Sequence, residues 1–412
     1  MKILSKSNHK YIILFTDRNF LPFWISFFAF GMGTGLFTIS LNWWVLLETN
    51  SEVQLGLVNT FALIPMLIFC FFSGIIVDNF DRKKIVIFAL IFRGFVFYSY
   101  LILNYFQILN IWTVYILAFF QGLSFPFYLN AINAIMPEII EKENLLSANA
   151  LVDAAMWSAS IIGFFSGGFL IESFGIMNLF MLSAFITIGA GLLFFLIKYS
   201  FEKPLKKISL FSFFSDIKNG VSLLKKDSAL LIFILTWSGI FILFGNGPMS
   251  IGWPVFSKRI LNAGSGGYGL LVAMYSLSSL IGSLVIGHWG VNIKKGKLTL
   301  IGYIWGSIGI IIFSFTTDLL SASIVLFFWS FYYPLINVSY WTALQERVPH
   351  EELGKITGVT FTLTSALGPV SLMMTGYLME FVSITLPFLL FGIAFIICFI
   401  MIYLSKETRV LR

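Results

Sequence analysis

Charged side chains are scarce in this chain of 412 residues. Only 11% of the residues are Asp, Glu, Lys or Arg, and 58% are hydrophobic. Soluble domains carry about 25% charged residues, which keep their surfaces hydrated. The composition therefore excludes an ordinary soluble domain.

Cysteine and histidine are scarcer still. Cys70 and Cys398 both lie inside apolar stretches, and the only histidines are His9, His288 and His350. Two isolated apolar cysteines are typical of packing residues rather than of a disulfide or a metal site. Scattered histidines supply no catalytic constellation, and no glycine-rich phosphate loop is present. We therefore expect no metal, no cofactor and no enzymatic activity. A polytopic membrane enzyme such as an acyltransferase is the less favoured alternative.

Long apolar runs make up most of the sequence. A helix needs about 20 apolar residues to cross a bilayer, and continuous rather than alternating hydrophobicity favours helices over barrel strands. The sequence predicts an all-α membrane protein with twelve transmembrane helices. Their expected spans are 20–47, 53–77, 84–104, 110–136, 150–173, 176–198, 228–256, 266–291, 298–317, 320–344, 357–383 and 385–404.

Basic residues follow a one-sided pattern along these spans. Counted over alternate loops, 23 of the 26 Lys and Arg fall on one side, Lys258 and Arg259 fall on the other, and Arg93 lies inside a span. Because basic loops stay in the cytoplasm, we expect a multi-pass cell-membrane protein with both termini cytoplasmic. This topology accounts for the net charge of +7 without nucleic acid as a partner.

One polar segment divides the spans six and six. Residues 199–227 are too polar to cross a membrane, and their apolar residues recur at the spacing of a surface-lying amphipathic helix. We predict three parts: an N-terminal bundle over 1–198, a cytoplasmic linker over 199–227 and a C-terminal bundle over 228–412.

The two halves resemble each other. ENLLSANAL (143–151) aligns with EELGKITGV (351–359), and the same offset aligns GFLIE (168–172) with GYLME (376–380). Internal repeats are typical of transporters with a central site that faces each side of the membrane in turn. Chance similarity between apolar helices is the alternative.

The loop after the second span carries five charges in seven positions. It reads GIIVDNFDRKK from Gly74 to Lys84, with Asp78, Arg82 and Lys83 among its members. This loop resembles the signature loop of the major facilitator superfamily, and the segments ANAIMPEIIEKENLLSANAL (131–151) and LQERVPHEELGKITG (344–358) extend the likeness. Within that superfamily the chain resembles the drug:proton antiporter branch, which includes macrolide-efflux and siderophore-export proteins. The resemblance implies two pseudo-symmetric six-helix bundles.

The resemblance also implies that Gly74, Asp78, Arg82 and Lys83 form a gating motif. Asp78 is expected near the N-terminal end of the span 357–383, and Arg82 is expected to pair with a carboxylate, for which Asp153 is our candidate. The alternative is that the basic residues only satisfy the positive-inside rule.

Arg93 is a separate case because it lies nine residues beyond Lys84 in the sequence, deep in a span. A charge at that depth is costly unless it meets water or a partner. It is a candidate for proton coupling or for binding an anionic substrate, and snorkelling toward the headgroups is the alternative. Asp153 and His288 are the other coupling candidates.

Polar and aromatic side chains on four spans are candidates for the substrate cavity, although such stripes also arise from plain helix packing. The candidates are Thr34, Thr38, Asn42, Gln121, Ser124, Tyr128, Trp237, Asn246, Trp329, Tyr333, Asn337 and Tyr340. They suit a large, partly apolar ligand. The sequence thus predicts a monomeric secondary-active exporter of amphiphilic small molecules such as macrolide-like drugs, driven by proton antiport. The alternative within this fold is a siderophore, lipid or lysophospholipid transporter.

Overall fold

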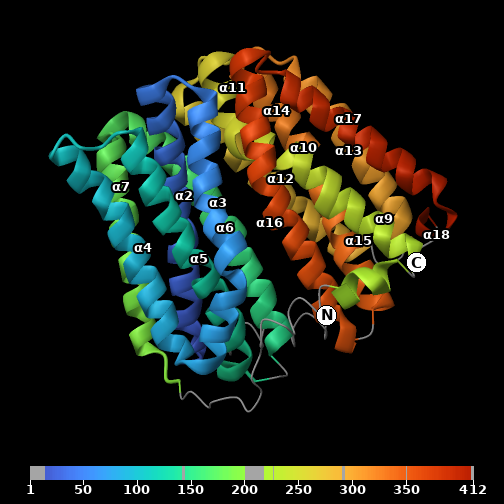
Figure 1. Ribbon diagram of the computed structural model, residues 1–412, viewed down its shortest axis with the longest axis horizontal. Helices are drawn as coiled ribbons and strands as arrows, with labels where there is room; N and C mark the ends of the chain where they lie inside the picture. Colours follow the sequence, from blue (N-terminus) through green and yellow to red (C-terminus); the bar gives the residue numbers. More distant parts are fainter. Residues whose placement is uncertain are drawn as a thin grey trace. The chain divides into compact units, whose positions relative to one another are not determined.

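A computed structural model describes residues 14–141, 144–199, 218–225, 227–289, 293–348 and 350–409, and within these ranges the chain is helical with no strand (Figure 1). Twelve helices or helix stacks there are long and apolar enough to cross a membrane. Each coincides with one predicted span, so the prediction of twelve transmembrane helices is confirmed.

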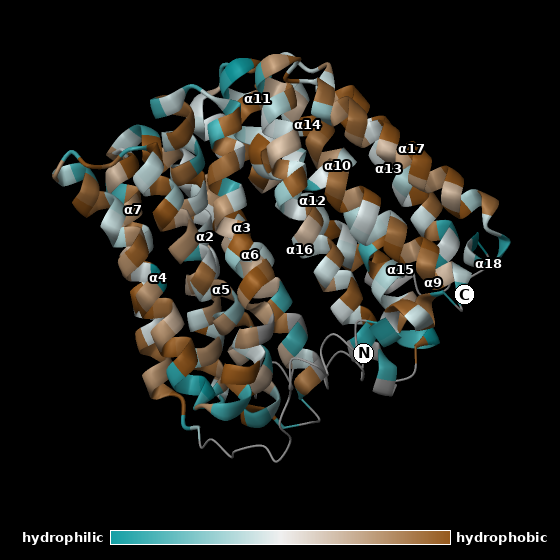
Figure 2. Cartoon of the chain, viewed as in Figure 1, coloured by the Kyte–Doolittle hydropathy of each residue, from teal (hydrophilic) through white to brown (hydrophobic). Residues whose placement is uncertain are grey.

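Most spans are single helices. Their bounds are α2 Phe20–Thr49, α3 Glu52–Asn79, α4 Arg82–Tyr105, α5 Ile111–Ile139, α6 Leu145–Phe174, α7 Ile176–Leu193, α12 Gly264–Trp289, α13 Lys295–Ser314, α16 His350–Phe381 and α17 Leu386–Leu404. A short 3-10 turn, η1 (Phe194–Leu196), extends α7, and α18 (Lys406–Arg409) follows α17. Figure 2 shows hydrophobic residues along most of each helix, with hydrophilic residues gathered near the helix ends.

Two spans depart from the continuous helices that we predicted. The span 228–256 is a stack of α9 (Ser228–Ile234), the π-helical η2 (Leu235–Phe241), α10 (Ile242–Gly247), the π-helical η3 (Pro248–Gly252) and α11 (Trp253–Arg259). The span 320–344 is divided into α14 (Leu319–Trp329) and α15 (Tyr332–Arg347). Pro248 begins η3 and Pro334 lies in the first turn of α15, where a proline lacks the N–H that a helix needs and its ring crowds the preceding turn. No proline lies in or directly after η2.

Contacts divide the chain into two compact units. Unit 1 comprises Met1–Trp44 and Ile64–Ile208, and unit 2 comprises Val45–Leu63 and Ser209–Arg412. Within unit 1, α4 and α7 lie side by side (Figure 1). α6 approaches α2 at Gly163, where a Cβ atom would lie 2.9 Å from the Met32 carbonyl oxygen. Glycine therefore permits the close packing of these two helices.

Unit 2 contains the segment 45–63 from the first half of the sequence. This segment packs on α16: a Cβ atom at Gly376 would lie 2.7 Å from the Glu52 carbonyl oxygen, and the Thr60 hydroxyl donates to the Pro369 carbonyl at 3.4 Å. The boundaries that we predicted at 198 and 228 stay a prediction. Of the predicted linker helix, residues 200–217 lie outside the described part, and 218–224 are helical.

Candidate functional site

The charged loop between α3 and α4 is organised around the start of α4. The Asp81 carboxylate caps this helix by accepting hydrogen bonds from the backbone N–H groups of Lys83 at 3.0 Å and Lys84 at 3.4 Å. A capping carboxylate satisfies two free N–H groups and complements the positive end of the helix dipole. One of the five charges in the loop therefore has a structural role.

Arg82 is the centre of an ion-pair cluster within unit 1. Its side chain is 10% exposed, is ion-paired with Glu138 at the end of α5, and lies 4.0 Å from the Asp78 carboxylate. The Tyr199 hydroxyl donates to the second Glu138 oxygen at 2.6 Å. Burial and the neighbouring Glu138 carboxylate raise the pKa of Tyr199, so its phenol stays protonated and continues to donate. We call Asp78, Arg82, Glu138 and Tyr199 the Arg82 cluster.

The carboxylate that pairs with Arg82 in this structure is Glu138, and the pairing with Asp153 stays a prediction. Asp153 lies on α6 with an exposed side chain, whereas Arg82 is ion-paired with Glu138. Glu138 occupies the last turn of α5, and its carboxylate reaches Arg82 together with Tyr199. His288, another coupling candidate, belongs to α12, but its side chain lies outside the described part.

The remaining motif residues differ in what they contact. The Lys83 ammonium donates to the carbonyl oxygens of Phe195 at 3.1 Å and Ile197 at 2.7 Å, at the end of η1. Lys84 is exposed and lies 4.0 Å from Asp81. A Cβ atom at Gly74 would meet the Asn130 side chain at an ordinary 4.0 Å. Packing within unit 1 therefore does not require glycine at this position.

A second charge cluster lies in unit 2, around the first residue of α3. The Arg259 side chain donates to the Glu52 carboxylate at 2.9 Å and to the Asn50 carbonyl at 2.9 Å. The Lys258 ammonium donates to the Leu46 carbonyl and to the Asn50 side chain. These are the two basic residues that the loop count assigned to the less basic side of the membrane. Both are engaged with residues 46–52.

Glu380 extends this cluster from the end of α16. Its carboxylate accepts from the Ser51 hydroxyl and from the Val53 backbone N–H at 2.8 Å. We call Glu52, Lys258, Arg259 and Glu380 the Arg259 cluster. Sequence reasoning missed it, although the isolated Lys258–Arg259 pair was a usable signal.

Arg93 lies in the interior of unit 1. It is 6% exposed, and its guanidinium donates to the Gln121 carbonyl at 3.2 Å and the Ser124 hydroxyl at 3.3 Å. It also lies over the rings of Phe30 and Phe97 at 5.4 and 5.3 Å. Within the described ranges these acceptors are neutral and no ion pair is formed. Arg93 therefore does not snorkel in this structure.

Some candidate cavity residues of unit 1, namely Gln121, Ser124 and Tyr128, lie near Arg93. Tyr128 is buried against Phe30 with ring centroids 4.1 Å apart, and Gln121 is 8% exposed. Thr34, Gln121 and Tyr128 each have a buried oxygen without a hydrogen-bond partner among the described residues. Asn42 is buried and Thr38 is half-buried on the same helix as Thr34.

The candidates of unit 2 separate into packing residues and more accessible ones. Trp329 is 1% exposed and donates to the Gly306 carbonyl at 2.8 Å, which makes it part of the bundle core. Tyr340 is also buried, with its hydroxyl 2.9 Å from that of Thr360. Trp237 lies in η2 against Tyr333, with ring centroids 5.7 Å apart.

Asn246, Tyr333 and Asn337 are half-buried. The Asn246 amide lies 3.5 Å from the Gly368 carbonyl. Asn246 belongs to α10 and Trp237 to the π-helical turn before it, and π-helical turns are frequent at functional sites.

Comparison with known proteins decides the family. The sequence profile of the Major Facilitator Superfamily matches residues 23–372. The chain belongs to this superfamily. The resemblance drawn from the loop 74–84 is thereby confirmed, and a non-enzymatic transporter is the activity class of this superfamily.

Major facilitator relatives with named substrates match most of the chain. The enterobactin exporter EntS of Citrobacter koseri is 24% identical over 356 residues, which cover 84% of this chain and 82% of that protein. The macrolide efflux protein A of Streptococcus pyogenes is 21% identical over 375 residues, which cover 88% of this chain and 89% of that protein.

Solved major facilitator structures share the fold. The crystal structure of a D-xylose-proton symporter superimposes with a TM-score of 0.75 at 13% identity, over 95% of this chain and 98% of that one. This likeness supports the architecture of the superfamily and does not extend to the substrate.

Proposed function

We propose that this major facilitator transporter exports hydrophobic or amphiphilic small molecules from the cytoplasm by alternating access, in exchange for protons. The observation that carries the direction of transport is the match, over more than four fifths of the chain, to two relatives named as exporters. The gating motif, with Asp78, Arg82 and Lys83, supports the same proposal through its resemblance to the drug:proton antiporter branch.

The Arg259 cluster supports alternating access. It joins residues 50–53, which precede or begin α3, to α11 and to the end of α16. A gate needs contacts that hold in one state and release in the other, and the Arg259–Glu52 pair links segments far apart in the sequence. We propose that this cluster closes the extracellular end of the transporter.

The orientation of the chain belongs to this proposal. Twenty-three of the 26 Lys and Arg lie in loops that would be cytoplasmic, together with both termini and the linker 199–227. The Arg82 cluster would then lie at the cytoplasmic end of α3, and Glu52 at the opposite end of the same helix.

Three residues are candidates for proton coupling in this proposal. They are Arg93, Asp153 and His288. Arg93 is the strongest of them, because a buried cation among neutral acceptors is the arrangement that responds to an arriving anion or proton-carrying group. Asp153 is weaker because its side chain is exposed.

The test is a transport assay in inverted membrane vesicles. With a proton gradient imposed, addition of a true substrate should release protons from the vesicle lumen, which a pH-sensitive dye reports. A panel of macrolides, catecholate siderophores, lipophilic cations and lysophospholipids would separate the exporter readings from the lipid-transporter alternative. If no panel member moves protons but one accumulates in the vesicles, the antiport part of the proposal is wrong. If none accumulates, the export part fails as well.

A further inference from the structure

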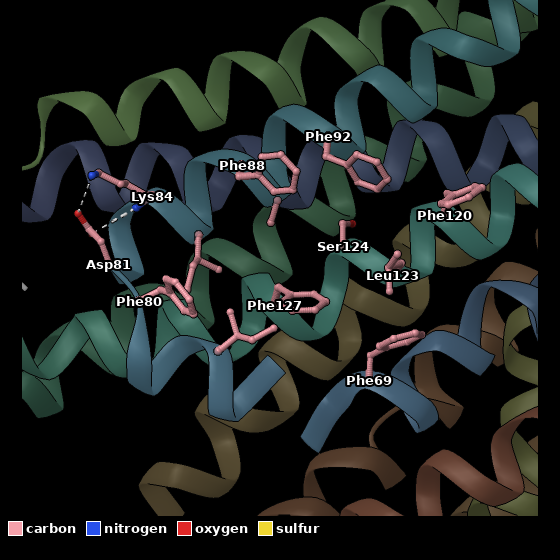
Figure 3. A pocket seen from close by; sticks show the side chains of 13 residues that line it. Phe69, Phe80, Asp81, Lys84, Phe88, Phe92, Phe120, Leu123, Ser124 and Phe127 are labelled. Atoms are coloured by element: carbon pink, nitrogen blue, oxygen red, sulfur yellow. Dashed lines mark hydrogen bonds and ion pairs between the residues drawn. The ribbon is translucent and has the colours of Figure 1, made fainter. Parts of the chain in front are cut away.

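A cavity of about 920 Å³ opens beside α3, α4 and α5 in unit 1. Figure 3 shows aromatic side chains from these three helices facing it. The aromatic members are Phe69, Phe80, Phe88, Phe92, Phe120 and Phe127. We call this cavity the phenylalanine groove. Such a lining accepts flat or aliphatic apolar groups without demanding a particular hydrogen-bonding pattern.

Ser124 is the polar residue in the central part of the groove, and Asp81 and Lys84 lie toward the start of α4 (Figure 3). The Ser124 hydroxyl donates to the Gln121 carbonyl at 2.8 Å and accepts from the Arg93 guanidinium at 3.3 Å. One side chain therefore links the groove to the buried cation.

Arg93 itself is incompletely satisfied. Its Nε atom is buried without a hydrogen-bond partner, and so is the Gln121 side-chain oxygen, in the part of the chain that the structure describes. A guanidinium has five N–H donors in a planar fork that matches a carboxylate or phosphate. A buried cation held only by neutral acceptors gains more from an arriving anion than an already paired one would.

We infer that Arg93 and Ser124 form an anion-binding subsite, and that the phenylalanine groove holds the apolar part of the same molecule. The ligand class is an amphiphile with one acidic group, a carboxylate or a phosphate, entering from the membrane. This inference rests on the proposed function because it names the class of molecule that the transporter exports. Charge complementarity selects this occupant over a neutral or cationic one.

The experiment measures binding and not transport. The parent protein is placed in nanodiscs of phosphatidylcholine and titrated with dansyl-undecanoic acid and with its methyl ester, with energy transfer from tryptophan to dansyl as the readout. The two probes share the dansyl group and the alkyl chain, and the ester replaces the negative charge with a methyl ester group. The acid should bind at least about tenfold more tightly than the ester, the size of one charge-assisted hydrogen bond. Equal affinities would overturn the inference.

Substitutions test the anion-binding part and the apolar part of the site separately. Arg93→Gln should bring the acid to the affinity of the ester, whereas Arg93→Lys should retain part of the preference because it keeps the charge. Phe92→Ala should weaken both probes equally. The matched control is Phe95→Ala, since Phe95 is exposed on the same helix but does not line the groove. A preference for the acid that persists in Arg93→Gln would contradict the assignment, and if that variant does not fold, a preference equal to the parent's in both Arg93→Lys and Ser124→Ala would contradict it.

A further arm separates a free acidic ligand from a resident acidic lipid. In nanodiscs that contain phosphatidylglycerol, the preference for the acid should persist. Its loss there would assign the site to a resident membrane lipid and overturn the inference. Because binding needs no gradient, an acid-selective protein that transports nothing would refute the proposed export and leave the anion site intact.

Discussion

The Arg82 and Arg259 clusters are built from the same kinds of residue but join parts of the chain at very different separations. Arg82 and Glu138 are 56 residues apart, and both belong to unit 1. Arg259 and Glu52 are 207 residues apart, and Ser51 and Glu380 are 329 apart. The Arg82 cluster therefore stabilises one bundle, whereas the Arg259 cluster links segments from both halves of the sequence. Our proposal that the second cluster is a gate requires that it can open without unfolding a bundle.

The clusters also differ in which charge is buried. In the first, the Arg82 side chain is 10% exposed and the Glu138 side chain 43%. In the second, the Glu52 side chain is 5% exposed and the Arg259 side chain 30%. Removing the exposed partner leaves the buried charge without its counter-ion. This destabilises the folded state more than removing the buried charge itself. This asymmetry allows each cluster to be tested separately.

The largest effect is expected for Glu138→Gln. It leaves the Arg82 guanidinium buried without its closest carboxylate, and should lower the free energy of unfolding by about 2 kcal/mol and abolish most export. Arg82→Gln should destabilise less, because the buried charge itself is gone. Thermal unfolding of the detergent-solubilised protein measures both, with Lys84→Gln as the exposed control. Equal stability of Glu138→Gln and the parent would show that the Arg82–Glu138 ion pair does not stabilise the bundle.

The next largest effect is expected for Arg259→Gln, in the proposed gate. It should change the balance between open and closed states more than the free energy of unfolding. Arg259→Gln removes the more exposed partner of the buried Glu52 carboxylate, so the closed state should lose at least about 1 kcal/mol, which shifts a two-state equilibrium at least about fivefold. Thr60 is 5% exposed against α16, so Thr60→Cys, in a background with Cys70 and Cys398 replaced by Ala, should label at least about fivefold faster from outside. Glu346→Gln, which breaks the Lys295 ion pair instead, is the control. Unchanged labelling would remove the Arg259 cluster from gating.

A smaller effect is expected for Lys83→Met, which keeps the apolar stem but removes two hydrogen bonds to the end of η1. Such bonds to terminal carbonyls contribute about 1 kcal/mol. Thermal unfolding should therefore separate Lys83→Met from Lys84→Met, in which an exposed ammonium is lost. If the two variants unfold at the same temperature, Lys83 only satisfies the positive-inside rule.

The smallest effect is expected for Asp153→Asn. Its exposed side chain is outside the Arg82 cluster, so the free energy of unfolding should change by less than about 0.5 kcal/mol. Export at equal protein level should stay close to that of the parent across the pH range. Loss of most export would return Asp153 to the coupling mechanism.

Sequence reasoning recovered what depends on local composition. The twelve spans were predicted to within a few residues, apart from the start of α16, because a bilayer imposes a length and a hydrophobicity that can be read without tertiary structure. The motif loop was found for a similar reason, since its five charges are contiguous. The π-helical turns at η2 and η3 were not predicted, although Pro248 marked the start of η3.

Ion-pair partners and cavities were harder to predict because they depend on distant residues. Asp153 and Glu138 were both available carboxylates, and only the packing of α4 on α5 selects Glu138. The phenylalanine groove combines residues of three helices, each of which separately resembles a lipid-facing stripe. Glu52 lies at the start of an apolar span, where an acidic residue is unremarkable at a helix N-terminus.

The packing of residues 45–63 has a consequence for biogenesis. A membrane chain is inserted as it is synthesised, so α3 enters the bilayer long before Gly376 and Glu380 exist. Until then, Glu52 lacks the backbone of α16 beside it, although Arg259 is already present. A ribosome-bound chain that ends before residue 376 should therefore hold a native first half except at the first turns of α3, which become protected only when α16 is complete.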